Sequence, residues 1–205
     1  MDSSDWDERY SGSEMVWSQA PNIWVEQIAA DLPPGKVIDL AAGEGRNSIW
    51  LAERGWQAVA LDFSEAAVIR ARSWAAERLG DDSDRFDANL GDLLRIRPDR
   101  RSYDLVLVIY LHVPEGERWM ILRSAAEYVT AGGLLVVVGH HTDNLTAGVG
   151  GPQDAAILFT AEDVVSDLED TGLQITRAER ALRAVETPAG PRNAIDVVVV
   201  AQRPQ

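Results

Sequence analysis

The fold of this chain is decided by the stretch Val37-Ile38-Asp39-Leu40-Ala41-Ala42-Gly43-Glu44-Gly45-Arg46-Asn47, an apolar run followed by a glycine turn. Glycines at positions 43 and 45 let the backbone approach a ligand closely, where a Cβ would clash. We expect a helix to begin near Arg46–Ser48, so that its first amides face the crevice above the strand ends. In an open α/β sheet, that crevice is where ligands bind.

The kind of ligand is indicated by an acid at the end of the apolar run and by a missing glycine. Dinucleotide-binding turns usually read G-x-G-x-x-G, but Ser48 stands at the third glycine position. The carboxylate of Asp39 would repel a bound pyrophosphate, whereas it would attract the sulfonium and ammonium groups of S-adenosylmethionine. The alternative is that Asp39 only orders the turn or caps the next helix.

Outward from this loop, short apolar runs alternate with longer segments of helical period. The runs are Lys36–Leu40, Gln57–Leu61, Tyr103–Tyr110, Leu134–Gly139 and Ile195–Ala201. The expected helices are Asn22–Leu32, Glu65–Leu79, Gly116–Val129, ended by Gly132-Gly133, and a segment that begins at a capping box around Thr160 and stops at Gly172. Runs that are apolar on both faces suit central parallel strands covered by helices.

The end of the chain departs from this alternation. Leu173–Ala184 and Ala194–Gln202 are joined by residues 186–191, a turn-rich link too short for a helix, which predicts an antiparallel hairpin. We therefore predict one α/β domain over residues 1–205, in which residues 1–34 precede a core at 35–205. The core is a Rossmann-like, doubly wound, mostly parallel seven-stranded sheet with a C-terminal antiparallel hairpin.

The ends of two further strands carry acids that suit a nucleoside. Asp62 lies about 20 residues past the glycines, where a carboxylate can accept both ribose hydroxyls, and Phe63 could stack on adenine. Asp92 could accept a hydrogen bond from the adenine amine while Leu93 packs on the ring. Alternatively, Asp62 caps the helix Glu65–Leu79, and Asp92 forms an Asx-turn. The predicted cofactor-binding set is Asp39, Ala41, Gly43, Gly45, Arg46, Asn47, Asp62, Phe63, Asp92, Leu93 and Ile109.

All three histidines follow the fourth and fifth strands. Because imidazole titrates near neutrality, His112 and His140 are predicted to take a proton from an acceptor molecule, although they could also be hydrogen-bonded loop residues. Tyr110 and His141 are predicted to line the acceptor site, which the long connection Leu145–Leu158 could shape. No metal site is expected, because adjacent histidines often point apart and no metal-ligand spacing occurs.

Composition narrows the possible partners. The chain has no cysteine, which excludes disulfides, thiol nucleophiles and Cys-ligated zinc. A formal net charge of −14 makes nucleic acid a poor partner. No apolar stretch is long enough to cross a membrane, and the acidic N-terminus does not read as a signal peptide, so we expect a cytoplasmic protein without a membrane partner.

With these motifs in order, the sequence resembles the class I S-adenosylmethionine-dependent methyltransferases, and among them the small tellurite-resistance and thiopurine-type branch. The likeness rests on Asp39–Ser48, Leu61–Ser64, Gly91–Leu93, Tyr103–Val106, Thr130–Gly133 and the opening Trp6–Tyr10. The resemblance implies that the first loop holds the methionine end of the cofactor, Asp62 the ribose and Asp92 the adenine. It also implies that residues 1–34 form a helical lid segment, with Tyr10 and Trp17 at the acceptor pocket.

These observations predict an S-adenosylmethionine-dependent methyltransferase that acts on a small molecule. The acceptor atom (O, N, S or a metalloid) and the oligomeric state stay open. Two alternatives stay open as well: an NAD-dependent oxidoreductase, and a non-catalytic protein that binds S-adenosylmethionine. The C-terminal hairpin, Asp39 and the missing third glycine count against the oxidoreductase.

Overall fold

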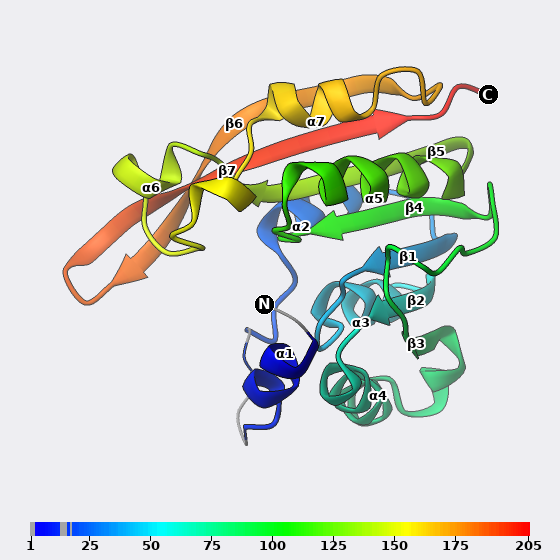
Figure 1. Cartoon of the computed structure of the whole chain (residues 1–205). Coiled ribbons are helices and arrows are strands. Elements are labelled where there is room, and N and C mark those ends of the chain that lie inside the picture. Colours follow the sequence, from blue (N-terminus) through cyan, green and yellow to red (C-terminus); the bar gives the residue numbers. More distant parts are fainter. Residues whose placement is uncertain (1–2, 13–15, 17) are drawn as a thin grey trace.

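A seven-stranded sheet forms the centre of the computed structural model, which describes residues 3–12, 16 and 18–205. The strand order is β3-β2-β1-β4-β5-β7-β6 (Figure 1). The strands are β1 Lys36–Leu40, β2 Gln57–Asp62, β3 Phe86–Leu90, β4 Tyr103–Ile109, β5 Val129–His140, β6 Gln174–Thr187 and β7 Gly190–Gln202. The α-helices are α1 Ser3–Tyr10, α2 Ile23–Ala29, α3 Arg46–Ala52, α4 Glu65–Leu79, α5 Glu115–Tyr128, α6 Asn144–Ala147 and α7 Ala161–Asp167, and the 3-10 helices are η1 Gly80–Arg85 and η2 Ala155–Ile157.

The sheet is parallel from β3 to β5 and antiparallel at its C-terminal hairpin. β7 inserts between β5 and β6 and runs against both. This confirms the predicted doubly wound, mostly parallel sheet with an antiparallel hairpin at one edge. The chain order reverses between β1 and β4, so the crevice above the carboxyl ends of these strands is the expected ligand site.

Helices cover both faces of the sheet because successive side chains of a strand point to opposite sides. On one face, Val136 and Val138 of β5 pack with α2, α3 and α4. On the other face, Leu135 and Val137 pack with α5 and α7. The central strands are therefore buried on both sides, which explains their uninterrupted apolar runs.

Element boundaries differ from those predicted at two glycine signals. β5 begins at Val129, so Gly132 and Gly133 lie inside the strand and do not end the preceding helix. The reason is that Val129 already pairs with Tyr103, across a register shift, and a Cβ on Gly133 would lie 3.0 Å from a β4 carbonyl oxygen. The predicted capping box at Thr160 is present, but α7 ends at Asp167, before Gly172.

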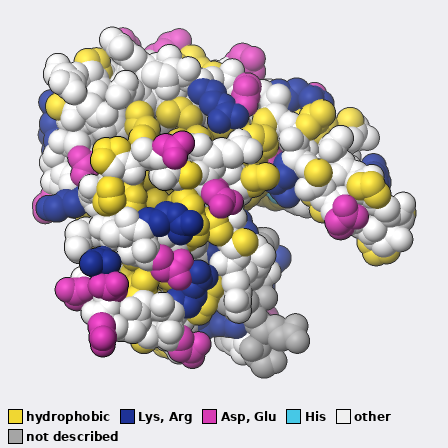
Figure 2. Space-filling view, turned by 180° about the vertical axis from the view of Figure 1, so that it is seen from behind, with side chains coloured by type: hydrophobic (Ala, Val, Ile, Leu, Met, Phe, Trp, Pro, Cys, Tyr) yellow, Lys and Arg dark blue, Asp and Glu magenta, His cyan; other side chains and the backbone are white. Residues whose placement is uncertain are grey.

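Two features extend beyond the core. The tip of the β6–β7 hairpin projects from the body of the molecule as an arm, which Figure 2 shows at the right. Helix α1 packs beside α4, near the carboxyl ends of the parallel strands (Figure 1). Within the described ranges, no helix combines the length and the apolar character needed to span a membrane.

Candidate cofactor and acceptor site

The turn between β1 and α3 is wound by three residues with positive φ. The φ angles are 59° at Ala41, 56° at Gly43 and 80° at Gly45, which is the N-cap of α3. At Gly45, a Cβ would approach the Ala71 side chain to 3.3 Å. Ala41 carries a side chain in the left-handed region, which costs roughly 1–2 kcal/mol. Strain of this kind gathers at functional sites.

Asp39 is the buried acid beside this turn, with an exposed fraction of 1 %. Its Oδ2 accepts a hydrogen bond from Ser48 Oγ at 2.8 Å, but its Oδ1 is buried without a hydrogen-bond partner among the described residues. Burial raises the pKa of Asp39 to about 7, against the opposing effects of Ser48 and Arg46. A buried carboxylate oxygen that lacks a donor is costly, and a cationic or N–H-bearing ligand would satisfy it.

Asp62 joins the end of β2 to the glycine turn. Its Oδ2 accepts from the Gly43 amide at 2.7 Å and its Oδ1 from the Ser64 amide at 2.9 Å. Ser64 is the N-cap of α4, so the alternative of Asp62 as the helix cap does not hold. Burial raises the pKa of Asp62. A carboxylate oxygen can accept two hydrogen bonds, so each Asp62 oxygen can still accept one from a ribose hydroxyl.

The predicted adenine side is more exposed. Phe63 has an exposed fraction of 37 %, which leaves its ring free to stack on a flat ligand. Asp92 Oδ1 accepts from the Leu94 amide at 2.9 Å, so the Asx-turn is present. Leu93 is half-buried behind it, and Ile109 is buried at the end of β4.

Two predicted residues at the start of α3 differ in what they contact. Asn47 is buried, and its Oδ1 accepts from the Asn22 amide at 2.9 Å, which ties the beginning of α2 to α3. Arg46 is half-buried within electrostatic reach of both Asp39 and Tyr110; burial lowers its pKa, and these two groups oppose that shift. Arg46 therefore connects the glycine turn with the end of β4.

Helix α1 is fastened to the start of α4 by polar contacts. Asp7 accepts hydrogen bonds from Ser64 Oγ at 2.5 Å and from the Ala66 amide at 3.2 Å. The Arg70 side chain donates to the Tyr10 carbonyl at 2.8 Å, and the Tyr10 side chain is buried. The N-terminal helix thus lies next to the end of β2.

A second anchor comes from the glycine turn itself. Glu44 is buried, accepts from the Val16 amide at 3.0 Å and lies 3.2 Å from Arg70 Nε. The Glu44 carboxylate, which belongs to the glycine turn, therefore holds Val16 against that turn. Trp17, which the sequence places at the acceptor pocket, lies outside the described residues.

A cluster of side chains gathers around a fully buried acid, Asp196 of β7. Asp196 Oδ2 accepts from Trp24 Nε1 at 2.8 Å, from the Tyr110 hydroxyl at 2.8 Å and from Arg183 Nε at 2.7 Å. Its other oxygen, Oδ1, lies 3.3 Å from Nδ1 of His140, its direct cross-strand neighbour. We call Trp24, Tyr110, His140, Arg183 and Asp196 the Asp196 cluster.

The electrostatics of this cluster keep its acid ionised. Burial alone would raise the pKa of Asp196, but the adjacent His140 ring and the hydrogen bonds from Arg183 and Trp24 outweigh burial and hold the pKa at about 2. Burial and the neighbouring carboxylate raise the pKa of Tyr110. Tyr110 also has a φ of 56°, so a strained residue ends β4 at the acceptor side of the crevice.

The three histidines occupy different surroundings. His112 Nε2 accepts from the His140 amide at 3.0 Å, and burial followed by the His140 charge lowers the pKa of His112 to about 4. The His112 and His140 rings are stacked, with centroids 5.4 Å apart. His141 is buried, and its Nδ1 accepts from the Asp143 amide at 3.0 Å. Of the three, only His140 joins the Asp196 cluster.

The connection after β5 packs directly on His140. A Cβ on Gly151 would lie 2.5 Å from Cδ2 and 2.7 Å from Nε2 of the His140 ring. The buried side chain of Asn144 holds this connection, because it donates to the Gly150 carbonyl at 2.8 Å and accepts from the Ile195 amide at 2.8 Å. The predicted contact of this long connection with the acceptor side therefore has a structural basis.

Sequence reasoning missed three members of the cluster: Trp24, Arg183 and Asp196. One signal was present, since Asp196 is a lone acid inside the apolar run Ile195–Ala201. A buried charge in such a run requires partners. Arg183 and Trp24 carry no comparable signal, because nothing local in the sequence brings β6 and α2 to the same place.

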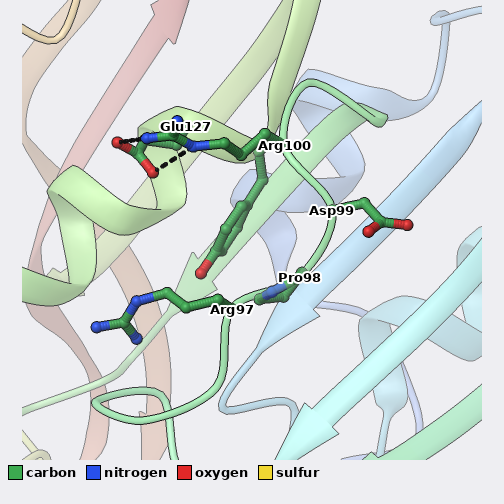
Figure 3. Close-up of a pocket in the computed structure, with 6 residues that line it drawn as sticks. Arg97, Pro98, Asp99, Arg100 and Glu127 are labelled. Atoms are coloured by element: carbon green, nitrogen blue, oxygen red, sulfur yellow. Dashed lines mark hydrogen bonds and ion pairs between the residues drawn. The ribbon is translucent and has the colours of Figure 1, made fainter.

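The opposite end of the sheet holds a different kind of surface. A shallow hollow there is lined by Arg97, Pro98, Asp99, Arg100, Glu127 and Tyr128 (Figure 3). Arg100 donates to Glu127 with two of its nitrogens, and both side chains are substantially exposed. This hollow lies away from the crevice above the strand ends, and two of its charged groups, Arg100 and Glu127, pair with each other.

Comparison with known proteins agrees with this geometry. A family described as a methyltransferase domain matches residues 37–133. The chain is 25 % identical over 125 residues to the probable S-adenosyl-L-methionine-dependent methyltransferase TehB of Haemophilus influenzae, a match that covers 59 % of this chain and 42 % of TehB. The chain spans less than half the length of the curated relatives that it matches.

Solved structures share the fold. A protein from the conversion of a disulfide bond into a thioacetal group during echinomycin biosynthesis superimposes with a TM-score of 0.75 at 18 % identity, over 98 % of this chain and 92 % of that one. Magnesium protoporphyrin IX methyltransferase (ChlM) from Synechocystis PCC 6803, solved with bound SAH, superimposes with a TM-score of 0.69 at 21 % identity. This match covers 98 % of this chain and 94 % of ChlM.

The fold and the crevice define an α/β domain of the Rossmann-like methyltransferase type. The matched family and the relatives agree with this class: residues 37–133 match a methyltransferase-domain family, and the chain is similar to S-adenosylmethionine-dependent methyltransferases.

Proposed function

We propose that the protein transfers a methyl group from S-adenosylmethionine to a small-molecule acceptor. The observation that carries this proposal is Asp39 Oδ1, a buried carboxylate oxygen that has no donor within the described part of the chain and lies beside a turn with three positive φ angles. A dinucleotide pyrophosphate would be repelled at this place, whereas a sulfonium or ammonium group would be attracted.

The described residues fit this cofactor. Asp39 would face its cationic end, Asp62 its ribose hydroxyls, and Phe63 and Leu93 its adenine ring. When bound, S-adenosylmethionine supplies a methyl group on a sulfonium, so that a lone pair of the acceptor forms the new bond to carbon while the C–S electron pair returns to sulfur. The protein then has to align the acceptor and exclude water, and helix α1, which is anchored through Asp7, would help to cover the crevice.

A small acceptor is supported by charge and by fold. The net charge of −14 disfavours a phosphate polymer. ChlM, which shares the fold over nearly the whole chain, is named for methylating magnesium protoporphyrin IX. The Asp196 cluster places an imidazole, a phenol and a guanidinium at the acceptor side of the crevice, as a compact polar acceptor requires.

Calorimetric titration with S-adenosylmethionine, S-adenosylhomocysteine and NADH tests the cofactor. We expect saturable binding of the first two and no heat with NADH. Binding of NADH alone would overturn the proposal in favour of an oxidoreductase. A non-catalytic binding protein is distinguished by incubation with labelled S-adenosylmethionine and an acceptor panel, in which it would bind the cofactor and transfer nothing.

The predicted histidine roles are tested in the same assays. His112→Ala and His140→Ala should slow turnover with little change in cofactor affinity. The two need not be equivalent, because Nε2 of His112 is already occupied by a backbone amide. Full rate in both variants with the true acceptor would remove both from the reaction.

A further inference from the structure

We propose that Asp196 is a positioning residue that fixes the tautomer of His140, so that His140 Nε2 takes a proton from the acceptor. The nucleophile of the acceptor is then a hydroxyl or a protonated nitrogen. This inference rests on the proposed methyl transfer and deepens it by naming the class of acceptor.

The two oxygens of Asp196 differ in their main partners. Three donors, from Trp24, Tyr110 and Arg183, converge on Oδ2 at 2.7–2.8 Å. Oδ1 faces His140 Nδ1 at 3.3 Å and accepts a longer hydrogen bond from Arg183 Nη2 at 3.5 Å. Because Asp196 is fully buried and ionised, it favours a proton on the imidazole nitrogen that faces it, and the second nitrogen, Nε2, keeps its lone pair.

The free nitrogen of His140 is the one that can meet an acceptor. Nδ1 is buried and has no hydrogen bond of normal geometry among the described residues, but it lies 3.3 Å from the Asp196 carboxylate; the side chain keeps an exposed fraction of 11 %. Gly151 lies along the Cδ2–Nε2 edge of the ring, where any side chain would collide with it. The glycine backbone thus packs on this edge of the ring, and an acceptor reaches Nε2 through the part of the side chain that stays exposed.

His112 does not fit the same role. Its Nε2 accepts the His140 amide hydrogen, so that lone pair is occupied. The bond fixes the backbone of His140 and stacks the two rings. We therefore assign the proton-accepting role to His140, and to His112 the support of its backbone.

The proton balance limits the class of acceptor. For a hydroxyl, the O–H bond breaks as the new bond to carbon forms; its proton goes to His140 Nε2 and its electron pair stays on oxygen. For a protonated amine, the N–H bond breaks first: the proton goes to His140 Nε2, and the electron pair left on nitrogen then forms the bond to carbon. Asp196 stabilises the resulting imidazolium, which then returns the proton to water. Thiolates and metalloid oxyanions carry a free lone pair near neutral pH and need no such base, whereas hydroxyl groups and protonated amines do.

The first test is ¹⁵N NMR of the histidine rings in the full chain without ligand. The three histidines give three ring signals, assigned from single His→Gln variants. We expect the Nδ1–H tautomer at His112 and His140, and the Nε2–H tautomer at His141, whose Nδ1 accepts the Asp143 amide. An Nε2–H tautomer at His140 in the wild-type protein overturns the proposal without any variant.

Asp196→Asn sharpens this test because it keeps the shape of the side chain. The three donors on Oδ2 require the amide oxygen there, so the amide NH₂ faces His140 Nδ1, which must then accept. We expect the His140 proton to move to Nε2. Asp143→Asn, beside His141, is the matched control and should leave His140 unchanged. An unchanged His140 tautomer in folded Asp196→Asn contradicts the positioning role.

Cofactor titration and turnover separate this inference from the methyltransferase proposal. No binding of S-adenosylmethionine, with the expected tautomers present, would overturn the methyl transfer and leave the Asp196–His140 pair standing. Methylation is then followed with a panel of phenols, amines, thiols and tellurite. We expect turnover of a phenol or an amine, with kcat lowered roughly 10²–10⁴-fold in Asp196→Asn at unchanged cofactor affinity. Turnover of thiols or tellurite alone would overturn the assigned acceptor class.

Discussion

The cofactor half of the crevice, at the ends of β1 and β2, is held mainly by contacts between residues close in the chain. Asp39 and Ser48 are nine residues apart, and Asp62 and Gly43 are 19 apart. The acceptor half joins side chains from α2, β4, β5, β6 and β7, and Trp24 lies 172 residues from Asp196. A local sequence motif can predict a site that is built from backbone turns. A site that is built from distant side chains forms only when the whole sheet brings them together.

The acceptor half should be the more sensitive to loss of its acid. Asp196→Ala removes the acceptor of three donors and leaves Arg183 without its buried counter-charge, which should lower the free energy of unfolding by about 3–5 kcal/mol. Urea unfolding measures this change. Asp143→Ala, whose exposed carboxylate pairs with Arg180, is the control and should cost at most about 1 kcal/mol. An equal decrease in the free energy of unfolding in both variants would show that the Asp196 cluster stabilises the protein no more than a surface ion pair does.

The cofactor half should instead respond in affinity. Asp62→Ala removes the proposed acceptor of the ribose hydroxyls and releases the Gly43 amide, which should weaken S-adenosylmethionine binding by roughly 1–3 kcal/mol. Calorimetry compares it with Asp87→Ala, an exposed acid on β3 that contacts Asn89. Unchanged affinity in Asp62→Ala would remove this residue from the cofactor site.

Asp39 makes the cofactor half sensitive to pH. Its pKa is about 7 in the folded protein against an ordinary value of 3.8, so between these values the folded state binds a proton that the unfolded state lacks. Its contribution to stability therefore falls as pH rises through this window and levels off above it. Affinity for the cationic cofactor should rise with pH near 7, by at most about tenfold per pH unit.

Asp39→Asn is the control for this pH dependence. Titrations of S-adenosylmethionine between pH 6 and 8 should show a flat affinity in the variant, because the amide does not ionise. A slope in the variant equal to that of the wild-type protein would assign the pH dependence to another group.

A pair of adjacent glycines tests how closely the connection after β5 approaches His140. Gly150 and Gly151 have φ angles of 69° and 74°, but only a Cβ on Gly151 meets the His140 ring. In both alanine variants, a residue with a side chain would have to adopt a positive φ, which should lower the free energy of unfolding by about 1–2 kcal/mol. Gly151→Ala should lose more, and its His140 ring signals should shift. Identical behaviour of the two variants would contradict the packing of this connection on His140.

The smallest effect is expected at Ala41. Ala41→Gly relieves the positive φ, partly offset by the greater entropy of the unfolded chain, so the protein should gain up to about 1 kcal/mol. Ala42→Gly relieves no positive φ, so the free energy of unfolding should fall by roughly 0.5–1 kcal/mol in this variant. Thermal unfolding of the two variants gives the comparison, and a loss at both positions would mean that Ala41 is not strained.

Much of the fold could be predicted because the signals are local. The apolar run Lys36–Leu40 predicted β1 with the bounds that the structure has. The helical period over Glu65–Leu79 predicted α4, and its N-cap, Ser64, directly precedes that stretch. The prediction that Gly132-Gly133 ends a helix was wrong, because pairing of Val129 with Tyr103 outweighs a glycine signal that acts only on its own turn. Helix α1 was expected only through the resemblance, as part of a helical segment over residues 1–34, because its position depends on Asp7 reaching Ser64 and Ala66.

The sequence by itself determined the order of strands and helices and the acids that close β1 and β2, because apolar periodicity and the turn with Gly43 and Gly45 act over a few residues. Only the tertiary structure decided which histidine faces a carboxylate. His140 and His141 are adjacent and chemically identical, but the antiparallel register of β5 with β7 sets His140 opposite Asp196. Register depends on pairing across the whole sheet, and a shift of one residue would place the other face of the strand at the site.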